Sequence, residues 1–277
     1  MPSSNPIAVF DSGYGGLTVL KELTAKLPQY DFIYLGDNAR APYGTRSFDT
    51  VYRYTLEAVK WFFKKGCPLV VLACNTASAK ALRSIQQKDL PKIDPSKRVL
   101  GVIRPTTELI GKFTKTNQVG IFATNGTVQS GSYLVEIEKF YPNVHVVQQA
   151  CPMWVPLIEN KEHLSAGADY FVKEYTDALL RQNAQIDTIL LACTHYPLLK
   201  EKIAQFLPTG INLISQAEIV ADSLADYLQR HPEMEERCSK QGHTRFYTTD
   251  STEDFDDKAA IFYGRQVSSQ HAELQED

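Results

Sequence analysis

Two cysteines occur in the same sequence context, and that context suits thiol chemistry. Cys74 lies in VVLACNTAS and Cys193 in ILLACTHYP, so each follows an apolar run and precedes residues that can form hydrogen bonds. Where such a run is a strand followed by a helix, the backbone N–H groups that begin the helix favour a thiolate and an anionic ligand. We therefore predict that Cys74 and Cys193 form a functional pair. The remaining cysteines lack this context and are interpreted as buried core residues: Cys67, Cys151 and Cys238.

Two further side chains could hold or move a proton beside these thiols. Asp11 follows the first apolar run; it either caps the next helix or places a carboxylate at the same sheet edge as Cys74. His195 lies two residues after Cys193 and could act as a proton partner near neutral pH. One Cys-x-His pair without other clustered ligands is a poor zinc signal, so no metal is expected. The segment GYGGLT lacks the third glycine of a dinucleotide-binding fingerprint.

The elements that would position these residues alternate between strand and helix. Short β-branched apolar runs predict strands at residues 7–10, 32–35, 69–73, 99–103, 119–123, 144–147, 188–192 and 211–214. Amphipathic stretches predict helices at residues 17–27, 48–65, about 76–87, 164–181 and after 216. This order predicts an α/β fold with mostly parallel sheets covered by helices on both faces.

The chain also reads as two halves of related layout. IAVFDSGYGG and VGIFATNGTV each predict a strand, a small polar turn and the start of a helix. We predict two similar α/β domains, residues 1–97 with 208–277 and residues 98–207, joined at the proline-rich segment LPKIDPSKR. Because ligands of open α/β sheets bind at the carboxyl ends of strands, both cysteines should face one cleft between the domains. The polar, acidic residues from about Gly264 onward are expected to be a disordered tail.

Composition and charge limit the classes of partner. The chain has 277 residues and a formal net charge of −3, which gives no general reason to bind nucleic acid or an anionic membrane but allows a small anionic substrate. The longest apolar run, about residues 69–74, is far too short to span a bilayer, and MPSSNPIAVF has no signal-peptide pattern. The cysteines are spread widely without a C-x-x-C pair, which fits reduced thiols in a cytoplasmic protein.

Taken in order, these motifs resemble those of bacterial glutamate racemases, within the aspartate/glutamate racemase superfamily. The matching segments are DSGYGGLTVL, YLGDNARAPYG, ACNTAS, TNGTVQSGSY, PLIE and ACTHYPLL, and they extend from about Ile7 to Leu199. The resemblance implies an isomerase that interconverts L- and D-glutamate between two α/β domains without a cofactor. It also implies that the D-glutamate supplies peptidoglycan synthesis, and through it cell wall biogenesis and cell shape. The resemblance leaves open whether the protein forms a homodimer.

The same resemblance assigns roles to individual residues. It makes Cys74 and Cys193 the two acid/base residues, assisted by Asp11 and His195. The positions that match substrate-contacting residues of the family are Asp11, Ser12, Tyr43, Gly44, Asn75, Thr76, Thr124, Thr127, Glu159, Thr194 and His195. Among these, Glu159 matches a carboxylate near the second cysteine, and Thr124 and Thr127 match threonines that line the pocket. Arg104, in GVIRP, receives no role.

The expected chemistry explains why two thiols would be needed. Racemisation removes the α-proton from one face of the carbon and returns a proton to the other, and cysteine has thiol and thiolate forms both accessible near neutral pH. No phosphate cradle with a Schiff-base lysine is evident, so hydrogen-bond donors must stabilise the carbanion; the candidates are Ser12, Asn75, Thr76, Thr194 and backbone amides. Two alternatives remain: an aspartate or related amino-acid racemase on this scaffold, and a non-catalytic amino-acid-binding protein.

Overall fold

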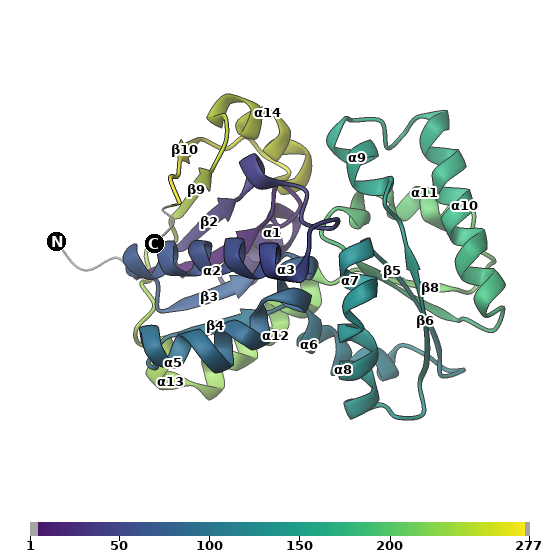
Figure 1. Ribbon diagram of the computed structural model, residues 1–277, viewed down its shortest axis with the longest axis horizontal. Coiled ribbons are helices and arrows are strands. Elements are labelled where there is room, and N and C mark those ends of the chain that lie inside the picture. The colour runs from purple at the N-terminus through teal and green to yellow at the C-terminus, as the bar shows by residue number, and fades with distance from the viewer. Residues whose placement is uncertain (1–4, 275–277) are drawn as a thin grey trace.

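The computed structural model describes residues 5–274 and contains two parallel β-sheets, each in its own half of the molecule (Figure 1). The first sheet has the order β10-β9-β2-β1-β3-β4 and the second has the order β6-β5-β7-β8. The first sheet consists of β1 (Ile7–Asp11), β2 (Phe32–Gly36), β3 (Leu69–Leu72), β4 (Arg98–Gly101), β9 (Thr244–Thr248) and β10 (Ser269–His271). The second consists of β5 (Gln118–Ala123), β6 (His145–Ala150), β7 (Thr188–Ala192) and β8 (Asn212–Ile214). The predicted α/β fold with parallel sheets is confirmed.

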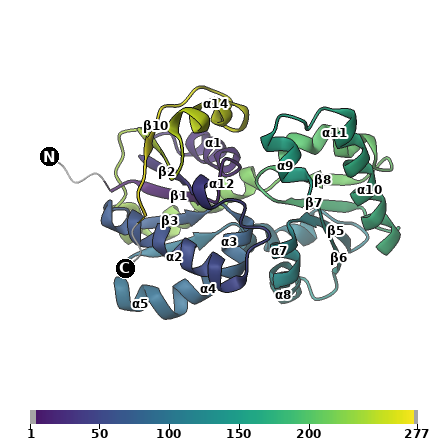
Figure 2. The same ribbon diagram turned by 45° about the horizontal axis from the view of Figure 1, so that its top comes forward.

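Helices cover both faces of each sheet (Figure 2). In the first domain these are α1 (Leu17–Lys26), α2 (Phe48–Lys64), α3 (Asn75–Lys80), α4 (Leu82–Ser84), α5 (Leu90–Ile93), α12 (Ala217–Arg230), α13 (Pro232–Glu235) and α14 (Thr252–Tyr263). In the second domain they are α7 (Asn125–Ser130), α8 (Ser132–Phe140), α9 (Trp154–Glu159), α10 (Ala166–Gln182) and α11 (Lys200–Gln205). The short helix α6 (Ile103–Thr107) follows β4 where the chain crosses between the sheets. The helix predicted at about residues 76–87 is instead divided into α3, α4 and a π-helical turn, Ile85–Asp89.

The central strands are buried on both faces. Because successive side chains of a strand point to opposite faces of the sheet, neighbouring residues belong to different hydrophobic cores. On β1, Ala8 belongs to a core that includes Phe62 of α2. Its neighbour Val9 belongs to the core that includes Leu20 of α1 and Leu224 of α12. A rigid two-sided core of this kind fixes the carboxyl ends of β1 and β3, where Asp11 and Cys74 lie.

The predicted domain boundaries need correction at both crossings. The strand β4 pairs with β3 in the first sheet, so the chain leaves the first domain after Gly101 rather than at 97/98. The strand β8 pairs with β7 in the second sheet, so the chain returns after Ile214 rather than at 207/208. The segment LPKIDPSKR is a surface connection inside the first domain. Its Pro91 lies in the first turn of the short helix α5, where proline is tolerated. Ile103, predicted to end a strand, begins α6.

The prediction of a disordered tail from about Gly264 onward is also wrong over most of that segment. Gly264 ends α14 in a left-handed conformation, and β10 then pairs with β9 along Ser269–His271. The backbone N–H of Ala272 donates to the carbonyl of Thr248 at 2.8 Å, and the Ala272 side chain is buried. An edge strand gains its stability from backbone hydrogen bonds, which a polar composition does not exclude. The part of the tail at residues 275–277 lies outside the described residues.

None of the helices in residues 5–274 is long and apolar enough to span a membrane.

Candidate active site

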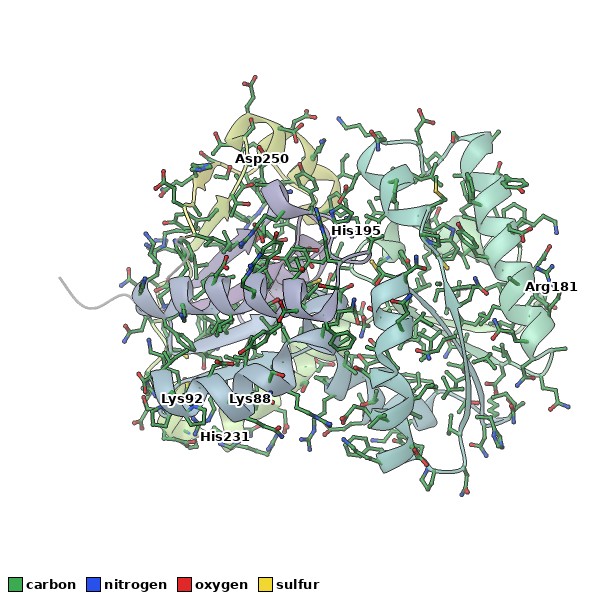
Figure 3. All side chains as sticks on the ribbon, in the orientation of Figure 1. Lys88, Lys92, Arg181, His195, His231 and Asp250 are labelled. Atoms are coloured by element: carbon green, nitrogen blue, oxygen red, sulfur yellow. The ribbon has the colours of Figure 1, made fainter. Side chains whose placement is uncertain are left out.

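The predicted site residues gather where strands of the two sheets end opposite each other. Asp11 is the last residue of β1, Cys74 follows β3, and Cys193 directly follows β7. The Thr194 hydroxyl donates to Oδ2 of Asp11 at 3.3 Å, which joins the second domain to the first. Figure 3 shows His195 lying between the two domains. The structure therefore brings both cysteines, Asp11 and His195 to one place.

Cys74 is held by the start of the helix that follows it. Its sulfur caps α3 and accepts a hydrogen bond from the backbone N–H of Ala77 at 3.4 Å, while the thiol donates to Oγ of Ser12 at 3.5 Å. Burial, and after it the neighbouring carboxylate of Asp11, raises the pKa of Cys74 to about 12. Cys193 adds to this rise, so the two sulfurs interact electrostatically. Cys74 is accordingly a thiol at neutral pH in this closed arrangement.

Asp11 is buried and lies between the two domains. Its Oδ1 accepts from the backbone N–H of Gly13 at 3.0 Å. Burial raises the pKa of Asp11, although the charge of His195 and the hydrogen bonds from Gly13 and Thr194 oppose the rise. The carboxyl group can thus exchange a proton more readily than an exposed aspartate could.

Cys193 belongs to a second chain of polar groups, which includes His195 and Glu159. Its sulfur lies 3.9 Å from Nδ1 of His195, and Nε2 of His195 lies 2.9 Å from Oε1 of Glu159. Burial favours neutral imidazole, but the hydrogen bonds to Cys193 and Glu159 outweigh it and raise the pKa of His195 to about 10. His195 is therefore an imidazolium at neutral pH, and its positive charge lies next to the Cys193 sulfur.

Three threonines from the two domains meet on another side of the site. Thr76 Oγ1 lies 3.0 Å from Thr124 Oγ1, which donates to Thr127 Oγ1 at 3.1 Å. The backbone N–H of Gly126 donates to the carbonyl of Gly44 at 2.8 Å, so the loop at residues 43–44 touches the second domain. A Cβ at Gly44 would lie 3.0 Å from Cβ of Thr124, which explains why a glycine suits this approach.

Two predicted contact residues have side chains that are already engaged. The hydroxyl of Tyr43 donates to Asp37, a fully buried carboxylate. The side-chain amide of Asn75 donates to Gln216 and accepts from Tyr133, so it is not the free donor that the sequence suggested. The Tyr43 hydroxyl has no further hydrogen to donate, and the Asn75 amide has one. The backbone N–H groups of the first turn of α3 have no partner within the helix, which suits an anionic group.

The two domains approach each other closely over the site. The Thr18 hydroxyl on α1 lies 3.0 Å from the carbonyl of Thr194, to which it donates. A Cβ at Gly15 would lie 2.6 Å from Cε1 of His195, so only a glycine permits this contact. Asp11, Cys74, Cys193 and His195 are between 1% and 7% exposed. A substrate can therefore reach the thiols only after the domains separate.

The sequence did not predict the buried residues that hold the site residues in place. Asp37, Tyr133 and Gln216 are buried polar residues that bind Tyr43 and Asn75. Asp37 and Tyr133 fall inside the motifs YLGDNARAPYG and TNGTVQSGSY, which was the available signal. Gln216 had none, since its partners are far away along the chain.

Other candidate regions do not join the site. Within residues 5–274, no group of three or more His, Cys, Asp and Glu side chains is arranged to hold a metal ion. A cavity of about 800 Å³ lies along the groove between the domains, but no predicted site residue lines it. Arg104 does line it and pairs with Glu108 at 2.8 Å.

Two α/β domains that bring together two thiols, a buried carboxyl group and an imidazole form a class of site suited to acid–base chemistry on a small substrate. Comparison with known proteins gives the family. The model of the Asp/Glu/Hydantoin racemase family matches residues 17–224. A curated glutamate racemase of Geobacter metallireducens is 41% identical over 245 residues, which cover 88% of this chain and 87% of the relative.

Solved structures give the same result over nearly the whole chain. Glutamate racemase isoform RacE1 of Bacillus anthracis is 34% identical, covers 98% of both chains and has a TM-score of 0.88. Glutamate racemase of Francisella tularensis, solved with D-glutamate, is 32% identical, covers 99% of this chain and 98% of its own, and has a TM-score of 0.85. The chain belongs to the Asp/Glu/Hydantoin racemase family, as one of its glutamate racemases.

Proposed function

We propose that this protein interconverts L- and D-glutamate by a two-base mechanism in which Cys74 and Cys193 are the bases. The observation that carries the proposal is the convergence of two buried thiols, one from each domain, with separate proton partners. The relatives named above support glutamate as the substrate, since the Francisella enzyme was solved with D-glutamate.

The charges of the closed site set the starting state. Cys74 begins as a thiol, because burial and Asp11 raise its pKa to about 12. In this direction of the reaction Cys193 must act as the thiolate, and the imidazolium of His195, with Nδ1 3.9 Å from its sulfur, can stabilise that negative charge. The Cys193 thiolate takes the α-proton of one enantiomer, and the Cys74 thiol then gives its proton to the opposite face of the carbon. One C–H bond breaks and one forms, and the thiol and thiolate exchange places.

The other enantiomer requires the reverse assignment. Cys74 must then be the thiolate and Cys193 the thiol, with the proton moved through the neighbouring polar groups before the substrate binds. Asp11 is the partner for Cys74, and the pair of His195 and Glu159 is the partner for Cys193. The resemblance to glutamate racemases makes Cys74 the base that faces the α-proton of the D-enantiomer.

The carbanion is the unstable species, and fixed donors lower its energy. The N–H groups at the start of α3, with the hydroxyl groups of Ser12 and Thr194, can bind a carboxylate whose charge grows during proton removal. Closure of the domains excludes water and strengthens these contacts. Because the thiols are almost fully buried, opening and closing must accompany each turnover.

In the cell we place this activity in the cytoplasm, where D-glutamate would supply peptidoglycan synthesis. All five cysteines are free and buried, which fits a reducing compartment. The resemblance to bacterial glutamate racemases supports the cell wall role.

The test is exchange of the α-proton in deuterated water with purified protein and no added cofactor. Both enantiomers of glutamate should exchange and racemise, and aspartate should react roughly tenfold more slowly or worse, since one methylene of the substrate changes its fit by about that factor. Exchange that required pyridoxal phosphate would contradict the proposal. Faster reaction of aspartate would favour the aspartate racemase alternative, and binding without exchange would favour a non-catalytic binding protein.

A further inference from the structure

A closed ring of three hydrogen bonds lies behind the site, and Gln216 completes it. The Nδ2 group of Asn75 donates to Oε1 of Gln216 at 2.7 Å, and Nε2 of Gln216 donates to the hydroxyl of Tyr133 at 2.7 Å. The Tyr133 hydroxyl donates in turn to Oδ1 of Asn75 at 2.6 Å. All three side chains are buried, so water does not compete for these bonds.

Gln216 occupies the point where the chain returns from the second domain to the first. It lies between β8, which belongs to the second sheet, and α12, which packs against α1 of the first domain. Its Nε2 also lies 3.0 Å from Oγ1 of Thr106 and 3.4 Å from the carbonyl of Val102, both at the outgoing crossing. One side chain thus touches both crossings.

The ring connects these crossings to the catalytic thiol. Asn75 is the first residue of α3, directly between Cys74, which caps the helix, and Thr76, which contacts the second domain. Tyr133 lies on α8 of the second domain. The ring can therefore close only when the two domains adopt this arrangement, and its closure holds the residue next to Cys74.

The donors and acceptors of the ring suit an amide at position 216. The Tyr133 hydroxyl has one hydrogen, which it gives to Asn75, so its oxygen must accept from Gln216. Gln216 also donates its second hydrogen to Thr106 and accepts through Oε1. A methionine of similar length provides none of these bonds. The Asn75 amide would lose its acceptor, and the hydroxyl oxygens of Tyr133 and Thr106 would lose the hydrogen that they accept, although each hydroxyl keeps the bond that it donates.

We propose that Gln216 is a positioning residue that couples closure of the two domains to the placement of Cys74 for proton transfer. This proposal rests on the proposed racemase function. Gln216 does not touch the reacting atoms; it acts through Asn75 and the first turn of α3.

The test uses Gln216→Met, Tyr133→Phe and the double variant. The matched control is Gln86→Met, whose amide donates to the carbonyl of Val99 at 2.7 Å within the first domain. Each ring variant should lower kcat/KM roughly tenfold, as expected for loss of buried hydrogen bonds near a reacting group. The double variant should lose little more than the worse single variant, because both break the same ring. The control should keep wild-type activity.

Two further readouts separate positioning from simple support of the fold. Misplacement of Cys74 slows the step in which it removes a proton, so the isotope effect of α-deuterated substrate should rise with D-glutamate and not with L-glutamate. Alkylation by iodoacetamide, measured by mass spectrometry of the peptides, should increase at Cys74 relative to Cys193. This ratio does not depend on activity.

Ring variants that lower the melting temperature but keep the wild-type isotope effects and the wild-type ratio of alkylation would overturn the positioning role. If Gln216→Met does not fold, Tyr133→Phe decides the matter, because it removes a single oxygen from the ring. A wild-type protein that exchanges no α-proton would refute the proposed function, and the alkylation ratio would still decide whether Gln216 positions Cys74.

Discussion

Gly15 offers a test of domain closure by the addition of one methyl group. An alanine Cβ at this position would lie 2.6 Å from Cε1 of His195, and closer still to Nδ1 of His195 and Oγ1 of Thr194. Ordinary contacts between carbon atoms are about 3.5–4.0 Å, so the opposing domain must move away by about 1 Å. Gly15 has no positive φ, so alanine fits its backbone and the separate domains should fold normally.

A displacement of this size acts directly on the catalytic groups. His195 would move with respect to the first domain, and a misplacement of about 1 Å costs roughly a hundredfold in rate. We expect Gly15→Ala to lower kcat/KM by about that factor while the melting temperature stays close to that of wild type. The assay is steady-state racemisation of each enantiomer, in which circular dichroism monitors the change in optical activity.

Gly13→Ala is the matched control from the same loop. A Cβ at Gly13 would meet its nearest atoms at 3.7 Å, which is an ordinary contact. This variant should keep most of its activity. If Gly15→Ala were as active as Gly13→Ala, the closed arrangement would not be the one in which proton transfer occurs.

Three further predictions concern charge and pH. Glu159→Gln should lower the pKa of His195 from about 10 by roughly 1–2 units, the size of one charge-assisted hydrogen bond. The alkaline limb of the plot of kcat/KM against pH should therefore move to lower pH. An alkaline limb at the wild-type pH would contradict this. Asp11→Asn should raise the isotope effect of α-deuterated D-glutamate more than that of the L-enantiomer, because Asp11 serves Cys74; equal changes would indicate a role in pocket shape alone. Asp187→Asn should lower the melting temperature much more at pH 7 than at pH 2. Hydrogen bonds from Thr114 and from two backbone N–H groups outweigh the burial of Asp187 and lower its pKa to about 2. The stabilisation is complete above the unfolded pKa of about 3.8 and is lost as the pH falls through the folded pKa of about 2. Equal destabilisation at both pH values would contradict the assignment.

The strands and the placement of the thiols could be predicted because their signals are local. An apolar run that ends in Ala-Cys identifies a strand and its carboxyl end without knowledge of the rest of the chain. Parallel sheets then bring such ends together, which is why Asp11, Cys74 and Cys193 were expected at one cleft.

The residues that support the site could not be predicted in this way. Gln216 binds Asn75 across 141 positions of sequence and Tyr133 across 83, and no local pattern reports such pairs. The edge strand β10 was missed because its pairing uses backbone groups, which its polar side chains do not reveal. The domain crossings were misplaced because proline and charge mark any surface connection, including one that stays inside a domain.

The central claim is that Cys74 and Cys193 act on opposite faces of one substrate, and single serine variants test it most directly. Each variant should lose racemisation, because a serine hydroxyl is far too weak an acid to replace a thiol. Each should still remove the α-proton on one face and so eliminate a leaving group from the β-carbon of a glutamate analogue of one hand.

The deciding measurement is which enantiomer of that β-substituted analogue each variant consumes. The account predicts opposite choices: Cys74→Ser should process the L-enantiomer through Cys193, and Cys193→Ser should process the D-enantiomer through Cys74. Consumption of the same enantiomer by both variants, or near wild-type racemisation by either, would contradict it.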